Sequence, residues 1–315
     1  MKTKNLIITA VIGLILISFT GCSLLRKRVE KKETVKYTLN GSGKTSIHVE
    51  NTNGRINVSN SNDTNGMITI EAEKIADVKV DEQDKPIENI KIKIDSAGSE
   101  INIETDVNHD RGMFHKGETP KVNYDIKVPA NMKVSAENVN GTITISRITA
   151  DVTAETVNGT ISIFSCPGQI NLSGVNGTII CNVDSVTAGI KVEVVNGSVK
   201  IGGLKTINAD VNATTVNGKV KFADLTFSNL NANKKSLSGT LGKGGNSIRV
   251  ESTNGSITFD ANKIAPKKDD TFEFKIDFDD DDEPVKIIKK EPGETKAPEN
   301  GDLPKAPVKT DSVKK

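Results

Sequence analysis

The chain has 315 residues, of which 42 are basic and 41 acidic, and its formal net charge is +1. A balance this even gives no electrostatic reason to expect nucleic acid as a partner. Aromatic residues make up only 3% and tryptophan is absent, so the flat rings that commonly bind sugars and bases are scarce.

The first 21 residues have the pattern of an export signal. Lys2 and Lys4 precede an apolar run, residues 6–19, which is too short for a spanning helix of about 20 residues. The following FTGC sequence resembles the lipobox of bacterial lipoproteins, in which the signal is cut before the cysteine. The resemblance implies that Cys22 is acylated, for example with palmitate, and anchors the protein in a lipid bilayer. The alternative is an ordinary cleaved signal with an incidental cysteine.

A lipid anchor predicts a place in the bacterial cell envelope. Ser23 is compatible with the outer membrane, if the cell has one. Loss of Lys2 and Lys4 with residues 1–21 leaves 40 basic and 41 acidic residues. We expect residues 22–34 to form a charged tether between the lipid and the folded domain.

Residues 35–134 contain alternating apolar and polar segments without a strict repeat. We expect irregular β-strands that belong to the same body as the repeats that follow. Two looser copies of the repeat motif occur here, at Asn53 and Asn65. Residues 108–120 interrupt the strands and indicate a loop.

Residues 135–260 repeat a Val-Asn-Gly motif at spacings of 16 to 21 residues, with a degenerate copy at Ser238. We number positions from the Asn of each copy, so that −1 precedes it and +1 is the Gly. A repeat of this length is one turn of a β-solenoid, whose turns pair at about 4.8 Å. Six Asn-Gly pairs are the expected structural turn residues: Asn140, Gly141, Asn158, Gly159, Asn176, Gly177, Asn196, Gly197, Asn217, Gly218, Asn254 and Gly255.

Apolar residues recur at −6, −1, +3 and +5, as Val152, Val157, Ile161 and Ile163 do in one copy. The period of two within each strand is typical of a half-buried strand. Between −6 and −1 the period-two alternation shifts by one residue. This shift predicts that the chain bends there and keeps all four positions in the core. Asn-Gly tolerates the positive φ of tight turns, and it also suits hairpins. Recurrence of the same residue types at the same positions favours stacking.

The sequence therefore predicts an all-β fold, a single-stranded parallel β-helix of roughly 18–21 residues per turn, with the right-handed connection usual for parallel strands. Stacking predicts a ladder of Asn side-chain amides. It also places Cys181 at +5 and Cys166 at +8, both in the core. About 11 Å would separate them, which is too far for a disulfide.

From residue 261 onward the composition changes. Residues 261–278 include the alternating segment TFEFKIDF, which we expect to cap the open end of the solenoid. Residues 279–315 are charged and proline-rich, with too little apolar sequence to fold. The acidic run 277–283 could bind calcium, but it lacks the glycine spacing of calcium loops, so a solvated charge run is favoured.

Other candidate chemistry is weaker. Asp151 and Asp210 share position −7, but Gln169 and Gly189 stand between them, so we expect no column of paired carboxylates. We predict no catalytic residues, no cofactor and no metal site. Four residues of one loop could supply metal ligands, although an ordinary solvated loop is favoured: His109, Asp110, His115 and Glu118.

Residues 122–146, VNYDIKVPANMKVSAENVNGTITIS, support a resemblance. With the VNG and TNG repeats, they resemble a bacterial domain family of unknown function whose members are candidate adhesins. That family has a tyrosine-hydrophobic-valine-proline segment before the repeats, here Tyr124 to Pro129. The resemblance covers roughly residues 35–260 and implies a β-helix-like fold, an adhesive role and no catalytic residues.

The last predictions concern the surface of the fold and the function that it serves. Length variation among the copies falls after +5, so one edge carries the variable loops, and repeat proteins often bind at such an edge. A hydroxyl-rich sheet face is also what a soluble sheet shows to water. We expect a non-enzymatic envelope lipoprotein that binds a surface protein or glycan. The alternatives are a polysaccharide-active enzyme and a periplasmic structural or signalling component. The expected outward residues are Thr142, Thr144, Thr160, Ser162, Thr178, Ser198 and Lys200.

Overall fold

The computed structural model describes residues 11–13, 28–62, 66–79, 85–107 and 120–265. These residues are predominantly strands, which confirms the all-β class. The helical elements among them are the single turn α1 (Lys85–Glu88) and the 3-10 turn η1 (Leu204–Thr206). No helix in this described part combines the length and apolar character that a membrane crossing requires.

Several predictions concern residues outside the described ranges. They are the lipobox with Cys22, the Asn65 turn, the four candidate metal ligands of the 108–119 loop, the capping segment at 271–278, the acidic run 277–283 and the tail.

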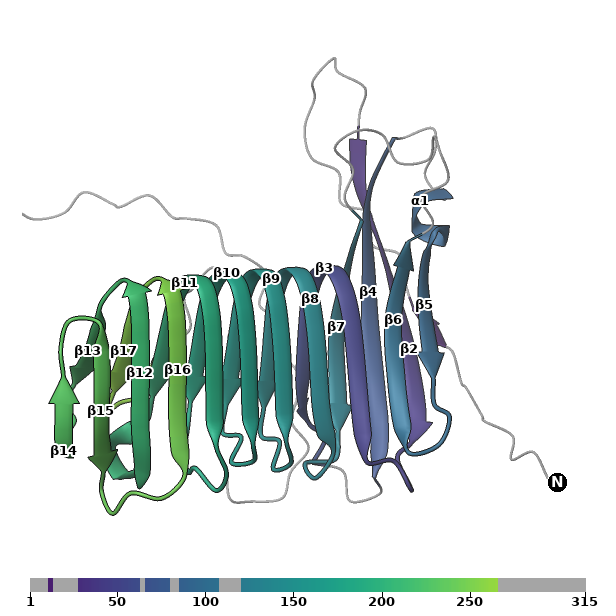
Figure 1. Ribbon diagram of the computed structural model, residues 1–315. Coiled ribbons are helices and arrows are strands. Elements are labelled where there is room, and N and C mark those ends of the chain that lie inside the picture. Colours follow the sequence, from purple (N-terminus) through teal and green to yellow (C-terminus); the bar gives the residue numbers. More distant parts are fainter. Residues whose placement is uncertain (1–10, 14–27, 63–65, 80–84, 108–119, 266–315) are drawn as a thin grey trace, which may run out of the picture. The chain divides into compact units, whose positions relative to one another are not determined.

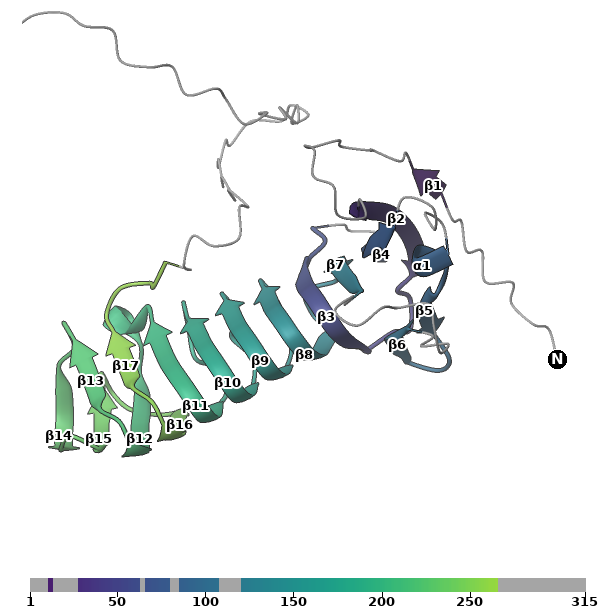
Figure 2. The ribbon, with the colours of Figure 1, turned by 90° about the horizontal axis from the view of Figure 1, so that it is seen from above.

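Five long strands each contain one whole copy of the repeat and pair in parallel, Asn against Asn. Two further copies are each divided into two shorter strands. We call these seven copies rungs and name each by its Asn. Figure 1 shows them side by side, and Figure 2 shows the same row from above. The whole-copy strands are β3 (Ser46–Asn60), β8 (Lys133–Ser146), β9 (Val152–Phe164), β10 (Ile170–Asn182) and β11 (Ile190–Gly202).

The order of the rungs departs from the order along the chain. The Asn254 rung, β16 (Ser247–Asn254) and β17 (Ile257–Asp260), lies between the Asn196 rung and the Asn217 rung. The Asn217 rung consists of β12 (Ala209–Asn217) and β13 (Val220–Ala223). In Figure 1, β16 accordingly stands between β11 and β12.

The degenerate copy at Ser238 is not a rung, contrary to the sequence prediction. It lies in β15 (Ser236–Leu241), which pairs antiparallel with β12 and with β14 (Phe227–Ala232). Leu241 at +3 is buried as in a rung, but Leu237 at −1 is buried where the rungs expose this position, and Ser-Gly in place of Asn-Gly supplies no amide to a ladder. Alternation alone cannot distinguish a hairpin from a stacked turn.

The segment before the repeats is only partly continuous with the stack. The Asn53 copy is a complete rung, and β6 (Glu100–Val107) and β7 (Lys121–Val128) extend its two halves in parallel. The remaining strands join antiparallel, so the prediction of one parallel helix is wrong here. They are β1 (Val11–Gly13), within the predicted signal, β2 (Arg28–Asn40), β4 (Met67–Lys79) and β5 (Ile90–Asp95).

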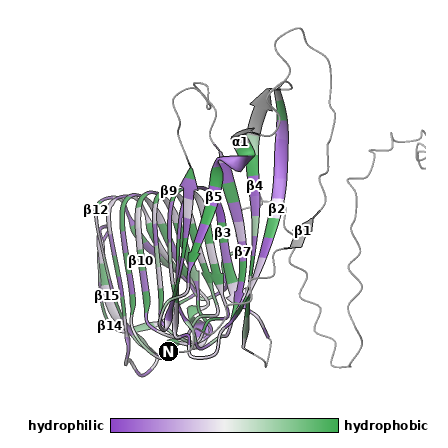
Figure 3. Cartoon of the chain, turned by 90° about the vertical axis from the view of Figure 1, so that its right-hand side faces the viewer, coloured by the Kyte–Doolittle hydropathy of each residue, from purple (hydrophilic) through white to green (hydrophobic). Residues whose placement is uncertain are grey.

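The core lies between the two halves of the rungs. Residues at −6, −4, +3 and +5 are buried in the central rungs, and the strands of Figure 3 alternate between apolar and polar residues. The sequence predicted that position −1 lies in the core, and this was wrong. Alternation continues from −4 to −2, and the bend comes at −1 and the Asn. Phe222, at +5 of the last rung, is also exposed. The exposed −1 residues are Val139, Val157, Val175, Val195 and Val216.

The bend depends on glycine at +1. Gly159 has φ 158°, and a Cβ added there would lie 1.7 Å from the carbonyl oxygen of Gly141 on the neighbouring rung. Gly177 and Gly197 repeat this contact, at the same 1.7 Å from the preceding glycine oxygen. Glycine is therefore required both for the backbone angle and for the close approach of stacked rungs.

Candidate binding surfaces

The Asn residues form a continuous amide ladder. Each side-chain Nδ2 donates to the Oδ1 of the adjacent rung over 2.7–3.0 Å, from Asn217 at one end of the stack to Asn53 at the other. The sequence predicts such a ladder, and the structure adds Asn53 and the inserted position of Asn254. One N–H of each donating amide is used, and a second remains.

Beside the ladder runs a row of exposed valines at position −1, which we call the valine row. Val139, Val157, Val175 and Val195 lie on four consecutive rungs and are 40–45% exposed. Thr253 and Val216 continue the row on the two rungs beyond. A single exposed valine is ordinary on a protein surface, whereas exposed valines on consecutive strands form a continuous apolar row.

A column of glutamates runs along the other side of the valine row, at position −3. We call it the glutamate column. Glu50, Glu137 and Glu155 are in register on three consecutive rungs. Ser173 interrupts the column, and Glu193 and Glu251 continue it. The prediction that no carboxylates stack was wrong, because it tested position −7 and not position −3.

Basic side chains at −5 accompany part of the glutamate column. Lys191 Nζ lies 2.8 Å from Glu193, and Arg249 bonds Glu251 at 2.6 Å. His48 lies 2.8 Å from Glu50 and 3.9 Å from Glu137. Among the described residues Glu155 forms no ion pair, so the negative charge is least compensated near the middle of the stack.

The opposite edge carries the loops of variable length, and a cavity of about 350 Å³ opens there. Arg147 and Ser165, at +7 of consecutive rungs, have φ of 56° and 54°. Such angles in non-glycine residues are uncommon and concentrate at functional sites. The polar lining comprises Asn60, Arg147, Thr149, Ser165, Asp184 and Ser185.

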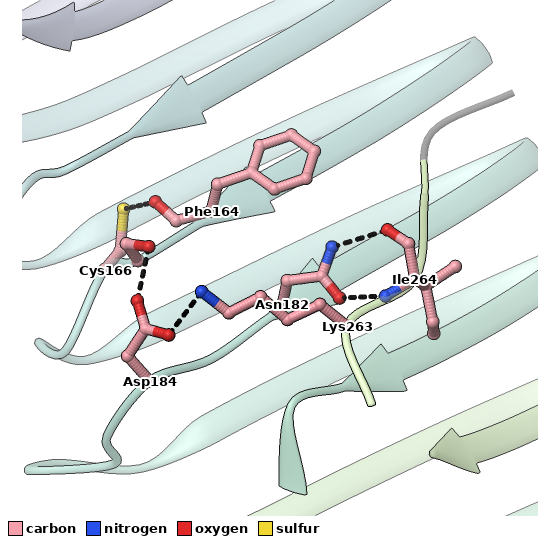
Figure 4. Close-up of polar contacts among 7 residues, drawn as sticks. Phe164, Cys166, Asn182, Asp184, Lys263 and Ile264 are labelled. Carbon is pink, nitrogen blue, oxygen red and sulfur yellow. Dashed lines mark hydrogen bonds and ion pairs between the residues drawn. The ribbon is translucent and has the colours of Figure 1, made fainter. Parts of the chain in front are cut away.

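Asp184 connects this cavity to the segment after β17 (Figure 4). Its carboxylate accepts from Ser165 Oγ and pairs with Lys263. The Lys263 ammonium and then the Ser165 hydroxyl hold the pKa of Asp184 below its ordinary value. Asn182 exchanges two hydrogen bonds of 2.8 Å with the backbone of Ile264. These contacts hold residues 263–264 against the loop edge.

The hydroxyl-rich face is only partly as predicted. The Thr residues at +2 and +4 are half-buried, whereas Ser162 is 4% exposed, like its register neighbour Ile180. The chain after β17 reaches the end of this strand, since Ile264 bonds Asn182 two residues beyond Ile180.

The two described cysteines are buried and free, in agreement with the sequence. Cys181 lies in the +5 row between Ile163 and Ile201. Burial raises the pKa of Cys166 to about 11 and that of Cys181 to about 12. Both thiols are therefore protonated at neutral pH and unreactive as nucleophiles.

Tyr124, which opens the segment that resembles the adhesin family, is a core residue. Its hydroxyl lies 2.7 Å from Thr105 Oγ1, and Thr105 donates to Asn51 at position −2 of the first rung. Burial raises its pKa to about 12. Asn51 donates in turn to the carbonyl of Val122. The segment therefore joins the first rung to β6 and β7, and sequence patterns gave no signal for this network.

The described residues gather no group of three or more His, Cys, Asp or Glu side chains able to hold a metal ion. What the geometry offers is an extended surface: an apolar row between a carboxylate column and an amide ladder, with a cavity on the opposite edge. Such a surface can bind a partner through many repeated contacts.

No protein-family model matches the chain, and no curated protein matches it. Among solved structures, the chain is similar to a candidate cell adhesion protein from Clostridium sporogenes, with 14% identity, 74% of this chain and 99% of that chain covered, and a TM-score of 0.38. A candidate adhesin from Bacteroides fragilis has 13% identity, coverages of 76% and 99%, and a TM-score of 0.29. One from Parabacteroides merdae has 11% identity, coverages of 72% and 95%, and a TM-score of 0.25. Similarities this low carry no argument about function.

Proposed function

We propose that this protein is a non-enzymatic scaffold of the bacterial cell envelope, with a β-solenoid body that binds a protein or glycan in the manner of an adhesin. The observation that carries the proposal is the repetition of the same outward side chains, Glu at −3 and Val at −1, on consecutive rungs. A surface of this kind accumulates affinity from many small contacts, and it does not concentrate reactive groups at one point.

We propose further that acylated Cys22 anchors this scaffold and that residues 22–27 act as its tether. The rest of the predicted tether, residues 28–34, belongs to the strand β2. Two acyl chains give stable membrane attachment, whereas one gives only marginal attachment. We expect Cys22→Ser to abolish incorporation of labelled palmitate. Cys166→Ser is the matched control, because its thiol is buried. Incorporation of labelled palmitate that persists in Cys22→Ser would refute the anchor.

The capping segment belongs to the same proposal. Phe222 on the last rung and Leu230 in β14 are 41% and 44% exposed, and we expect the apolar side of residues 271–278 to cover them. The chain would then consist of a lipid-anchored tether, a solenoid closed at its end and a charged tail, residues 279–315.

One observation favours a second candidate, a polysaccharide-active enzyme, because Glu137 and Glu155 lie in register on adjacent strands. Paired carboxylates on neighbouring turns are what such chemistry needs. These side chains lie on an exposed sheet face and not in the cavity, so the scaffold is the better supported function. Saccharide cleavage that is lost in Glu137→Gln/Glu155→Gln would reverse this choice.

A further inference from the structure

The valine row and the columns beside it form a surface that repeats with the spacing of the strands. Neighbouring rungs are about 4.8 Å apart. An extended peptide repeats its side chains on one side at about 6.6 Å, and an α-helix repeats at about 5.4 Å per turn. Over the four consecutive valines, these mismatches grow to about 5 Å for the peptide and about 2 Å for the helix. Only another stack of strands keeps register with every rung.

We propose that the occupant of this surface is a second copy of the same chain, packed valine row against valine row. Two arrangements bring the rows together. If the two-fold axis runs along the row, the stacks are parallel and each rung faces its equivalent. If the axis runs across the row, the stacks are antiparallel and the Asn140 rung faces the partner's Asn196 rung.

The charges distinguish the two arrangements. In each copy the glutamate column lies on one side of the valine row, and the Asn ladder lies on the other. In the parallel arrangement each glutamate column faces the partner's ladder, whereas in the antiparallel one glutamate faces glutamate. Each ladder amide keeps a second N–H, and bonds from such donors to carboxylates are stronger than neutral ones. Like charges that face each other are unfavourable. The parallel arrangement is therefore selected.

The parallel arrangement also directs the amino-terminal ends of both stacks to the same side. This agrees with two chains anchored in one membrane through Cys22, a point that rests on the proposed function. The valine row is small compared with the roughly 800 Å² per partner of a stable interface, so the pair depends on the high local concentration that a membrane provides.

The test is cysteine cross-linking of the full chain in membranes of expressing cells, with a bis-maleimide that spans about 10 Å, the spacing of packed sheets. Val139→Cys should give a cross-linked dimer. The matched control is Thr142→Cys on the same strand but at +2, beyond the ladder, and it should give at least tenfold less dimer. The unmodified chain reports any background from Cys166 and Cys181, which are buried.

Two further pairs of substitutions show whether the valine row itself forms the contact. Val157→Lys/Val175→Lys, added to Val139→Cys, should abolish the dimer, whereas Thr160→Lys/Thr178→Lys should leave it unchanged. In the antiparallel arrangement Val139 would lie about 14 Å along the stack from its equivalent, so only a mixture of Val139→Cys and Val195→Cys would cross-link. That outcome, equal cross-linking of Val139→Cys and Thr142→Cys, or no dimer at all would overturn the proposal. Fractionation of the same membranes reports the anchor separately.

Discussion

At the scale of single residues, the repeat is fixed by glycine more strictly than by any apolar residue. A buried Ile or Val can be replaced by a residue of similar volume at modest cost. At Gly159 the neighbouring backbone oxygen occupies the space that a Cβ would need, only 1.7 Å away. The Asn-Gly motif in the sequence predicts the positive φ, but the close approach between rungs becomes evident only when they are stacked.

Gly159→Ala should therefore lower the free energy of unfolding by about 4 kcal/mol or more, in the range that is exceptional for one substitution. Gly43→Ala is the matched control, because Gly43 has φ 77° but no atom within 4 Å of the added Cβ. Gly43→Ala should lower the free energy of unfolding by only about 1–2 kcal/mol, which is the cost of the left-handed backbone angle alone. Chemical denaturation of both variants measures the difference, and equal costs would show that the rungs do not stack this closely.

The buried cysteines give a second residue-scale prediction. Their raised pKa values mean that folding favours the protonated thiols. The corresponding stability is complete below the ordinary pKa of 9.0 and is lost as the pH rises towards 11 or 12. Maleimide should label Cys166 and Cys181 only after denaturant is added at pH 7, whereas an introduced Val157→Cys should react in the native state. Rapid native labelling of either buried cysteine would contradict the assigned core.

At the scale of elements, the sequence predicted the rungs better than their order. The Asn-Gly spacing locates the strands β8 to β11, and the residues at −6, +3 and +5 indicate their buried side. The Asn-Gly spacing cannot show that the Asn254 rung lies between the Asn196 and Asn217 rungs, because the edge of every rung offers the same pairing groups to a neighbour. The glutamate column and the valine row could have been predicted from the sequence. If the buried alternation is continued from −4 to −2, positions −3 and −1 fall on the exposed side.

The contribution of the ladder can be measured within one strand. Asn176→Ala removes a donor to Asn158 and an acceptor from Asn196, and should lower the free energy of unfolding by about 1 kcal/mol. Asn171→Ala, on the same β10 strand but at −5, is the matched control and should cost only a few tenths. If urea denaturation gives both variants the same stability, the ladder does not stabilise the stack.

The contact between Asp184 and Lys263 predicts a pH dependence. Because the pKa of Asp184 is lowered, its contribution to stability is present above the ordinary pKa of 3.8 and is lost as the pH falls below it. Asp184→Asn should cost less than about 1 kcal/mol at pH 7, since the side chain is 51% exposed, and the difference from wild type should vanish near pH 2. Asp125→Asn is the control, since Asp125 forms no ion pair among the described residues. A difference that persists in acid would exclude the ion pair as its cause.

At the scale of the whole molecule, the stacked rungs present one extended surface built from repeated side chains. Repetition explains why the core residues, the glycine column and the outward rows all recur together, since each rung must match the next. The function that we propose follows from exposure of that surface to a partner outside the cell. The proposed function therefore requires that the surface is accessible from outside the cell.

The most direct test is protease shaving of intact cells, followed by detection of residues 35–260 and, separately, of the tail. The account predicts that both are cleaved or released from unbroken cells, while a cytoplasmic marker stays intact. Complete protection that is lost only after the envelope is disrupted would contradict the surface-binding function, and it would favour a periplasmic structural or signalling component.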